Sequence, residues 1–243
     1  DADPRFVDPE NDDYRLLASS LCINAGHPDS TDSDGTQADM GMYPHLNDYD
    51  GPDWYVSEDG DDLTGTGEIG NPFFSIQGGI NFAETEADIV NVEAGTYIEN
   101  ITFRGHNTSV FGTGGPENTI IDGYASGSVV EFSDGESNEA LLSGFTLQNG
   151  LAYLGGGIYL NNSSSPTLEN LIISDNNASY GGGIRTEAGS DNALIKNVII
   201  SNNTASYHGG GCNFFSSVIL ENVLITGNTA VSGGGIIFSS IGT

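Results

Sequence analysis

The apolar and polar positions in the second half of the chain repeat as one phrase. Each copy holds three or four apolar, mostly β-branched residues with an Asn on either side, and it ends in three consecutive glycines. The glycine triplets begin at 155, 181, 209 and 233, in steps of 26, 28 and 24 residues. Apolar runs this short predict strands rather than helices. A period in the twenties is typical of a solenoid of stacked coils.

The repeated positions predict a role for each part of a coil. Stacked in register about 4.8 Å apart, the apolar runs form parallel sheets whose inward side chains make continuous columns. Asn tolerates left-handed backbone at bends and can bond to its equivalent in the next coil. We therefore expect amide ladders before and after the strand, formed by Asn170, Asn197 and Asn222 and by Asn176, Asn203 and Asn228. The glycines supply a corner where positive φ or close backbone approach excludes a side chain.

A different pattern precedes the coils. Trp54–Ser57 predicts a short strand, and residues 74–84 have apolar positions at helical spacing. Such a helix would plug the first coil, because an uncovered solenoid end exposes apolar side chains and unpaired backbone groups. We predict a β-helix domain over residues 49–243, with its cap in 54–88 and six to seven coils in 89–243.

Residues 1–48 form an acidic, turn-rich segment with little regular alternation. A segment this short buries too little surface to fold alone, so it must pack against something. We interpret it as a closing or linking segment. The apolar residues available for such packing are Phe6, Val7, Tyr14, Leu16, Leu17, Leu21, Cys22 and Ile23.

Charge excludes one class of partner. The chain has 34 acidic and 5 basic residues, a net charge of −29, which rules against nucleic acid because binding it requires cationic contacts to phosphate. No apolar run approaches the roughly 20 residues of a membrane span, so we expect no membrane insertion. Half of the acids, 17, lie in residues 1–62 with only Arg5 and Arg15 in compensation. This clustering favours either solubility or binding of divalent cations.

Two acidic clusters are candidate calcium sites. Asp29, Asp32, Asp34 and Asp39 surround Gly35, and oxygen ligands on a glycine turn suit Ca²⁺. The alternative is a solvated acidic loop. Asp59, Asp61 and Asp62 form a second candidate cluster.

The two cysteines do not form a disulfide framework. Cys212 stands where the other coils have Ile after the glycine triplet, which predicts a core position. A bond between Cys22 and Cys212 requires the acidic segment to pack near that late coil.

Several stretches resemble a known family. The segments 54–62, 71–77 and 92–100 and the Gly-Gly-Gly-Ile coils are similar to secreted right-handed parallel β-helix proteins, including polymorphic outer-membrane and adhesin-type members. Residues 3–8, 13–16, 20–26 and 34–41 resemble the segment that closes such domains at the C-terminus. The resemblance implies an all-β, right-handed parallel β-helix in a secreted or cell-surface protein.

A closing segment that precedes an opening segment has two interpretations. The chain is an excerpt of a larger protein, or residues 1–46 of one molecule cap the open C-terminal coil of the next, which ends at Ile241–Thr243. The second arrangement builds a head-to-tail fibre, because a heterologous contact that does not close gives an open filament. We expect an extracellular fibre or surface-layer subunit whose partners are copies of itself. The alternative is an adhesive or carbohydrate-binding surface module.

Catalysis is a third hypothesis, that of a polysaccharide lyase or hydrolase. The coils offer only Arg104, Arg185 and Lys196 as basic residues, and no Asp trio recurs on neighbouring coils, so we expect no catalytic residues.

Two further features concern glycans. Tyr153, Tyr159, Tyr180 and Tyr207 would either stack sugar rings or form a ladder that stabilises the coils, since Tyr180 and Tyr207 share a repeat position. Candidate glycan acceptors in Asn-X-Ser/Thr sequences are Asn100, Asn107, Asn161, Asn162, Asn177 and Asn202.

Overall fold

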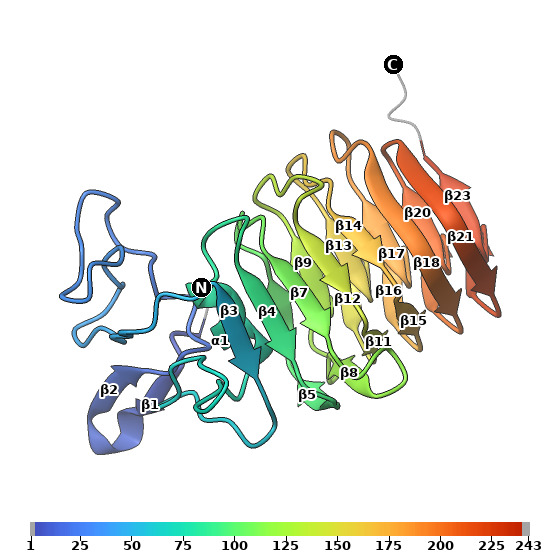
Figure 1. The fold of residues 1–243 in the computed structure, drawn as a ribbon. Helices are drawn as coiled ribbons and strands as arrows, with labels where there is room; N and C mark the ends of the chain where they lie inside the picture. Colours follow the sequence, from blue (N-terminus) through green and yellow to red (C-terminus); the bar gives the residue numbers. More distant parts are fainter. Residues whose placement is uncertain (1–2, 240–243) are drawn as a thin grey trace.

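The computed structural model describes residues 3–239. Residues 53–238 wind into a right-handed parallel β-helix with one short α-helix (Figure 1). This confirms the predicted fold class. Residues 1–2 and 240–243 lie outside the described part, and so does the open end predicted at Ile241–Thr243.

The largest sheet runs along the rod in two parallel rows. The first row comprises β3 (Asp53–Val56), β4 (Ile89–Val92), β7 (Ser109–Gly112), β10 (Leu141–Ser143) and β14 (Thr167–Glu169). The second comprises β5 (Gly95–Ile98), β8 (Thr119–Asp122), β11 (Thr146–Gln148) and β15 (Ile172–Ser174). Two nine-residue strands, β18 (Ala193–Ser201) and β21 (Val218–Thr226), pair with each other along their length. Because β18 also pairs with both β14 and β15, the two rows merge into one sheet.

Two smaller parallel sheets complete the coils, one of them only in the later coils. One comprises β12 (Leu151–Leu154), β16 (Asn177–Tyr180), β19 (Thr204–His208) and β22 (Thr229–Ser232). The other comprises β6 (Ile101–Thr102), β9 (Val130–Phe132), β13 (Ile158–Leu160), β17 (Ile184–Thr186), β20 (Cys212–Phe214) and β23 (Ile236–Phe238). The glycine triplets join them at a tight corner. A Cβ atom on Gly182 would lie 2.4 Å from the Gly210 carbonyl oxygen of the next coil, so the stacked corners leave no room for a side chain.

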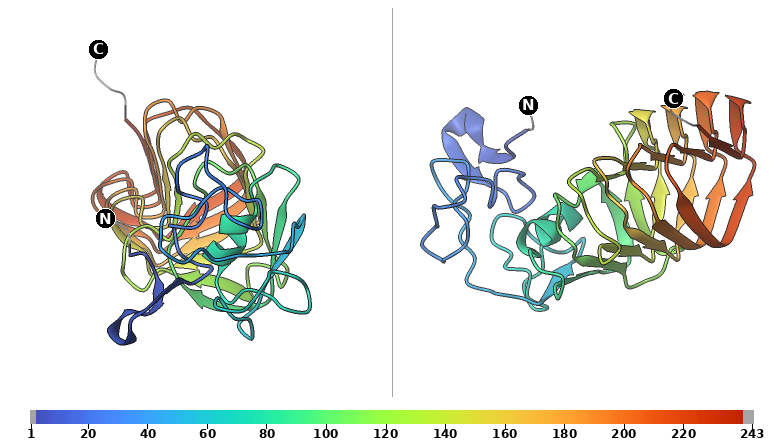
Figure 2. Two further views of the ribbon diagram at one scale, coloured as in Figure 1. Left: turned by 90° about the vertical axis from the view of Figure 1, so that its left-hand side faces the viewer. Right: turned by 90° about the horizontal axis from the view of Figure 1, so that it is seen from above.

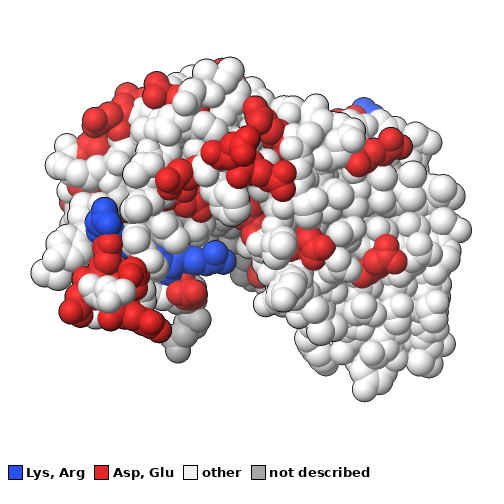
Figure 3. Space-filling model, turned by 90° about the horizontal axis from the view of Figure 1, so that it is seen from below, with Lys and Arg blue, Asp and Glu red and all other residues white. Residues whose placement is uncertain are grey.

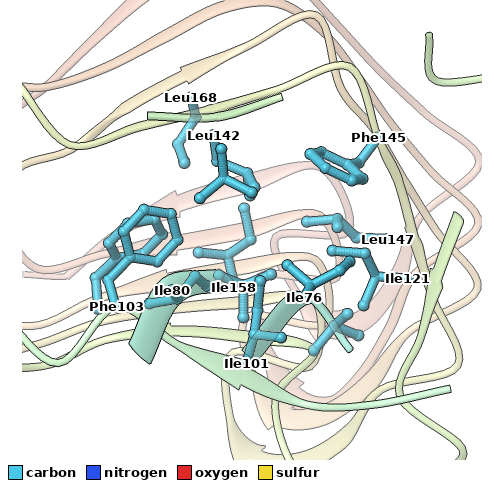
Figure 4. Close-up of a cluster of buried hydrophobic side chains, with 14 of the residues drawn as sticks. Ile76, Ile80, Ile101, Phe103, Ile121, Leu142, Phe145, Leu147, Ile158 and Leu168 are labelled. Atoms are coloured by element: carbon cyan, nitrogen blue, oxygen red, sulfur yellow. The ribbon is translucent and has the colours of Figure 1, made fainter. Parts of the chain in front are cut away.

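The core consists of columns of inward side chains along the rod (Figure 4). Register places Leu142, Leu168 and Ile195 in one such column, all fully buried. Another column runs through Ile184 and Cys212, so this cysteine fills the place that Ile takes in other coils. Phe103 and Phe132 stack with their ring centroids 4.2 Å apart. Each column is continuous because inward residues repeat at the same point of every coil.

The helix α1 (Ile76–Phe82) covers the first coil, as the sequence predicts for residues 74–84, and all seven of its residues are buried. It begins at Ser75, whose side chain accepts a hydrogen bond from the Gly78 amide at 3.0 Å. Both oxygens of Glu99 accept from the next two amides, those of Ile76 and Gln77, at 2.8 and 3.1 Å. The free N–H groups of the first turn are therefore satisfied by side chains.

Residues 3–47, which we call the leader, lie at the α1 end of the rod, opposite the last coil (Figure 2). The leader contains a small antiparallel pair, β1 (Phe6–Asp8) and β2 (Asp13–Leu16), joined by a 3₁₀ turn at Pro9–Asn11. The rest of it is irregular, as its sequence predicts.

Candidate functional site

The leader binds the first coil of its own chain. The buried Asn81 amide donates to the carbonyl oxygens of Ala18 and Ser20 at 2.7 and 2.9 Å. Arg104, on the turn after β6, donates to the Ile23 carbonyl at 2.8 Å and to Asn81 Oδ1 at 2.8 Å. These contacts cap the rod end beyond α1.

This arrangement corrects the expected use of the leader's apolar residues. Leu16 is 1% exposed and Ile23 is fully buried, both in the core of their own chain rather than free for a neighbour. Phe6 and Cys22 pack against the same core, and Tyr14 packs edge-on against Phe6 with ring centroids 5.4 Å apart. The physical reason is proximity: Asn81 and Arg104 bind the leader to the α1 end of its own rod, so its apolar residues join that core.

The leader nevertheless exposes apolar side chains that the sequence reasoning missed. Met42 is 79% exposed, Met40 53%, Leu46 50% and Tyr43 45%. They follow one another closely in the segment 40–46, which lacks the alternation that would mark it as a strand.

The cysteines are not paired with each other. Cys22 is a half-buried free thiol in the leader, and Cys212 is a buried free thiol in a late coil, toward the opposite end of the rod (Figure 2). Burial raises the pKa of the Cys212 thiol.

The first acidic cluster folds the leader's loop. Asp34 accepts from the Thr36 amide and hydroxyl and from the Asn47 amide, at 2.8 to 3.1 Å. Asp39 accepts from the amides of Asn24 and His45 at 2.8 and 2.7 Å. Burial disfavours ionisation of both, but the hydrogen bonds outweigh it at Asp34 and lower its pKa, whereas burial prevails at Asp39 and raises its pKa.

The other two carboxylates of this cluster differ in their hydrogen bonding and exposure. Asp32 accepts from the Asp39 amide at 2.9 Å, and Asp29 is exposed. In the described residues, no three His, Cys, Asp or Glu side chains gather as ligands for a metal ion. Calcium binding here stays a prediction.

The second acidic cluster is divided among separate roles. Asp61 accepts from the Leu63 amide at 2.7 Å, which closes a turn and lowers the Asp61 pKa. Asp62 accepts from the amides of Phe74 and Ser75 at 3.0 Å. Asp59 is exposed.

The Asn positions come together in two ladders of different character. Inside the rod, Asn203 accepts from the Asn176 side chain and donates to Asn228, each at 3.0 Å. On the outside, Asn222 donates to Asn197 at 2.9 Å, and Asn197 donates to Asn170 at 3.3 Å. The three outer residues have φ of 53° to 54°, so they also serve the bend.

Each basic side chain of the rod has a partner within its own chain. Arg104 holds the leader, as described. Arg185 pairs with Glu187 at 2.8 Å and lies 4.0 Å from the centre of the Phe215 ring. Lys196 lies 3.4 Å from Glu169. These groups bind neighbouring coils and loops rather than converge on a common point.

A cleft of about 240 Å³ lies between the leader and the rod, lined by Arg5, Gln77, Glu99 and Glu131 among others. Burial raises the pKa of Glu99 to about 7, against the effect of its two backbone hydrogen bonds. A carboxyl group with such a pKa suits general acid catalysis. Both oxygens of Glu99, however, accept from the first turn of α1, which gives this carboxyl a structural role.

The candidate glycan acceptors differ in accessibility. Asn100, Asn162, Asn177 and Asn202 are exposed, whereas Asn107 and Asn161 are half-buried. The Nδ2 atoms of both Asn100 and Asn162 already donate to carbonyl oxygens of an adjacent coil. Asn100 donates to Ser128 in the next coil, and Asn162 donates to Ser133 in the preceding coil.

The outer side of the sheet β12–β16–β19–β22 presents aromatic, aliphatic and hydroxyl groups, and we call it the Tyr face. Its exposed members are Leu151, Tyr153, Asn177, Thr204, Ser206, Tyr207, Thr229 and Val231. Tyr153 is 68% exposed, Tyr207 53% and Leu151 52%. None of the four strands contains Asp, Glu, Lys or Arg.

The tyrosines contact one another from coil to coil. The rings of Tyr153 and Tyr180 meet edge to face at 5.7 Å, and those of Tyr180 and Tyr207 stack at 5.3 Å. The strand register, however, pairs Tyr180 with His208 instead of Tyr207. Strand β19 contains one extra residue, which the pairing accommodates as an irregularity between Ala205 and His208. The expectation that Tyr180 and Tyr207 share a repeat position is therefore corrected. Tyr159 lies apart from these rings, on β13 of the neighbouring sheet.

A turn beside the Tyr face holds an aromatic residue in an unfavourable backbone conformation. Tyr124 and Ala125 have φ of 46° and 55°, and the Ser126 amide donates to the Gly123 carbonyl at 2.9 Å across them. Two consecutive positive φ values with this hydrogen bond match a type I′ turn, for which Asn-Gly is preferred. Tyr124 is 77% exposed, so burial of its ring does not explain its presence.

Charge is distributed unevenly along the rod. Residues 141–243 contain five acidic and two basic side chains of the chain's 34 and 5. Seen from below, the end with the leader carries most of the acidic surface, and the later coils are largely uncharged (Figure 3). The Tyr face belongs to this nearly neutral half.

Comparison with known proteins identifies the family. A family model described as "Right handed beta helix region" matches residues 77–243. No curated protein and no solved structure matches the chain. Within residues 3–239, no helix has the length and apolar character needed to cross a membrane.

Proposed function

The chain belongs to the right-handed β-helix family, and we propose that it is a rigid extracellular or cell-surface rod that adheres through the Tyr face. The observation that carries this proposal is the exposure of Leu151, Tyr153, Tyr207 and Val231 on one uncharged sheet. Exposed apolar groups that gather on a single face mark interaction surfaces. Regular stacking gives that face a fixed shape, which lowers the entropic cost of binding.

A non-catalytic role is part of the proposal. Arg185 and Lys196 pair with carboxylates, and Arg104 is committed to the leader. Glu99 is held by the first turn of α1. The groups best suited to acid–base chemistry are therefore engaged in holding the structure together.

Adhesion under flow tests the proposal. Microspheres coated with the full chain should be retained on a surface covered with extracellular polymer from the cells that produce the protein. Microspheres coated with the double variant Tyr153→Ser/Tyr207→Ser should be washed away. The variant Phe74→Ser removes an aromatic residue that is 52% exposed outside the Tyr face and should be retained like the wild type. Equal retention of all three proteins would refute adhesion through this face. Surface immunogold labelling of intact producing cells tests the location.

End-to-end assembly is a second candidate function, supported by apolar exposure at both ends of the rod. The leader exposes Met40, Met42, Tyr43 and Leu46, and the last described coil exposes Leu224 and Phe238 at 55% and 66%. Contact between these two surfaces on successive molecules is heterologous and would build a filament. A further coil of the same solenoid is the competing cover for the last coil.

Point variants test assembly better than deletion of the leader, because deletion would also uncover α1. Electron microscopy and sedimentation should show filaments for the wild type. Met42→Asp and Leu224→Asp should each yield single rods, because a charge buried at the joint is strongly unfavourable. Wild-type protein that stays monomeric at high concentration, or filaments that survive both substitutions, would contradict assembly by this contact.

A further inference from the structure

We propose that the Tyr face and the turn at Tyr124 bind a neutral polysaccharide, whose sugar rings lie along the rod axis. This inference rests on the proposed adhesive function and adds the chemical class of the partner. The observations that support it are the composition of the face, its strained turn, the adjoining groove and the direction of the tyrosine row.

The face matches the chemistry of a sugar ring. A pyranose has an apolar side of C–H groups and a rim of hydroxyls, so it is recognised by aromatic rings together with small polar side chains. Tyr153 and Tyr207 supply the rings, while Asn177, Thr204 and Thr229 supply amide and hydroxyl groups in register across neighbouring strands. Tyrosine also presents contact area at low cost in side-chain entropy.

The turn at Tyr124 adds a third ring at an energetic cost. A bulky residue with positive φ is an outlier, and strain of this kind concentrates at functional sites. Asp122 stabilises the turn, since it accepts from the Tyr124 amide at 2.9 Å and from the side chains of Gln148 and Asn149 at 3.0 and 2.7 Å. The conformation is thus held by its neighbours, and it presents the Tyr124 ring to solvent.

The groove between this turn and the Tyr face has a volume of about 450 Å³ and is lined by Tyr124, Leu151, Asp175 and Asn177 among others. Such a volume falls within the range of small-ligand sites. Asp175 and Asn177 are exposed at its rim and offer an acceptor carboxylate and an amide to sugar hydroxyls. The same carboxylate, on a chain of net charge −29, opposes an anionic sugar. The electrostatics therefore favour a neutral glycan over a uronate.

The direction of the tyrosine row fits a linear polymer. The row has one tyrosine in each of four successive coils. Tyr124 follows β8, Tyr153 lies in β12, Tyr180 in β16 and Tyr207 in β19. Coils that stack about 4.8 Å apart give a track of roughly 14 Å over three steps. A polymer along this track can engage several rings at once, so that weak contacts add up.

Calorimetry with the full chain tests the inference. The probes are the neutral hexasaccharides cellohexaose, mannohexaose and chitohexaose, with hexagalacturonate as the anionic control. At least one neutral probe should bind, and hexagalacturonate should not. Tyr153→Ser and Tyr207→Ser should each weaken that binding about fivefold, which corresponds to the stabilisation expected of one aromatic contact. Phe74→Ser should leave it unchanged.

The turn gives a variant that separates binding from stability. Tyr124→Asn should stabilise the protein, because Asn suits a type I′ turn, and should weaken glycan binding. Absence of binding by every neutral probe, preference for hexagalacturonate, or unchanged affinity of all three Tyr variants would overturn the inference.

Periodate separates this inference from the adhesive function on which it rests. The reagent destroys vicinal diols of sugars, so pretreatment of the polymer should abolish retention of coated microspheres. Retention that resists periodate yet still requires Tyr153 and Tyr207 would refute the glycan partner and leave adhesion intact. A second copy of the chain is the other partner that could cover the Tyr face, and light scattering of the free protein tests for it. A dimer that is lost in Tyr153→Ser/Tyr207→Ser would also overturn the glycan proposal.

Discussion

Replacement of Asn203 by Ala tests whether the inner Asn ladder holds the coils together. The Asn203 side chain is fully buried and makes four hydrogen bonds, to the Ile173 carbonyl, the Asn228 side chain, and the amide and side chain of Asn176. Two of these partners keep another hydrogen bond when the Asn203 side chain is removed. Asn176 Nδ2 also donates to the Leu147 carbonyl, and Asn228 Oδ1 also accepts from the Asn203 backbone amide.

The substitution therefore removes the side-chain partners of the Asn176 amide and the Ile173 carbonyl. A buried polar group left unsatisfied costs about 1–3 kcal/mol, so Asn203→Ala should lower the free energy of unfolding by about 4 kcal/mol. Asn203 is not among the residues with positive φ, so Ala adds no backbone strain.

The outer ladder supplies the matched control. Asn197 is exposed and has φ of 54°. Asn197→Gly keeps this conformation and should change stability by less than about 0.5 kcal/mol, whereas Asn197→Ala should cost about 1 kcal/mol through backbone strain. Urea unfolding followed by circular dichroism measures all three variants, and hydrogen exchange should report faster exchange of the Asn176 amide in Asn203→Ala. A loss below about 1 kcal/mol for Asn203→Ala, or slow exchange of that amide, would refute the reasoning.

Three further predictions concern the corner, the leader and pH. Gly182→Ala should prevent soluble folding, because its Cβ would meet a carbonyl oxygen at 2.4 Å, whereas Gly70→Ala, with open space around it, should express and melt like the wild type. Asn81→Ala should release the leader and speed its cleavage in limited proteolysis, whereas Asn118→Ala, which removes an exposed bond, should not; equal cleavage would argue against the clamp. Burial raises the pKa of Glu99 from 4.5 to about 7, so the contribution of this group to stability is fully present below pH 4.5 and falls as pH rises to about 7. Glu99→Gln should remove that fall when the free energy of unfolding is measured against pH. A pH profile identical to that of the wild type would contradict this prediction.

The repeating part of the fold was predictable from sequence because each determinant is local and recurs. A β-branched run, its flanking Asn residues and the glycine triplet each specify one part of a coil, and the period aligns them. The short helix was likewise predictable, because the apolar spacing of residues 74–84 indicates it.

The leader's placement was not predictable in the same way. Leu16 and Ile23 are buried in the same core as the α1 residues, and Asn81 of α1 binds Ala18 and Ser20, more than 50 residues away in the sequence. Only three-dimensional proximity specifies that surface. The exposed groups Met40 and Met42 became apparent only once the buried ones had been placed.

The candidate binding site was predictable in part. The tyrosines were visible in the repeats, but the position of Tyr207 depends on an irregularity that pattern alignment does not register. The turn at Tyr124 escaped notice because Tyr-Ala carries none of the usual turn signals. Its unusual φ values are a property of the folded chain.

Footprinting of the protein with its glycan bound tests the adhesive face most directly. Hydroxyl-radical labelling of the full chain, read by mass spectrometry, compares the protein alone with the protein bound to its preferred neutral hexasaccharide. We predict protection of Tyr124, Tyr153 and Tyr207, with Phe74 and Met42 as reactive as before. Protection centred on the cleft at Glu99, or none on the Tyr face, would contradict the assignment of function to this surface.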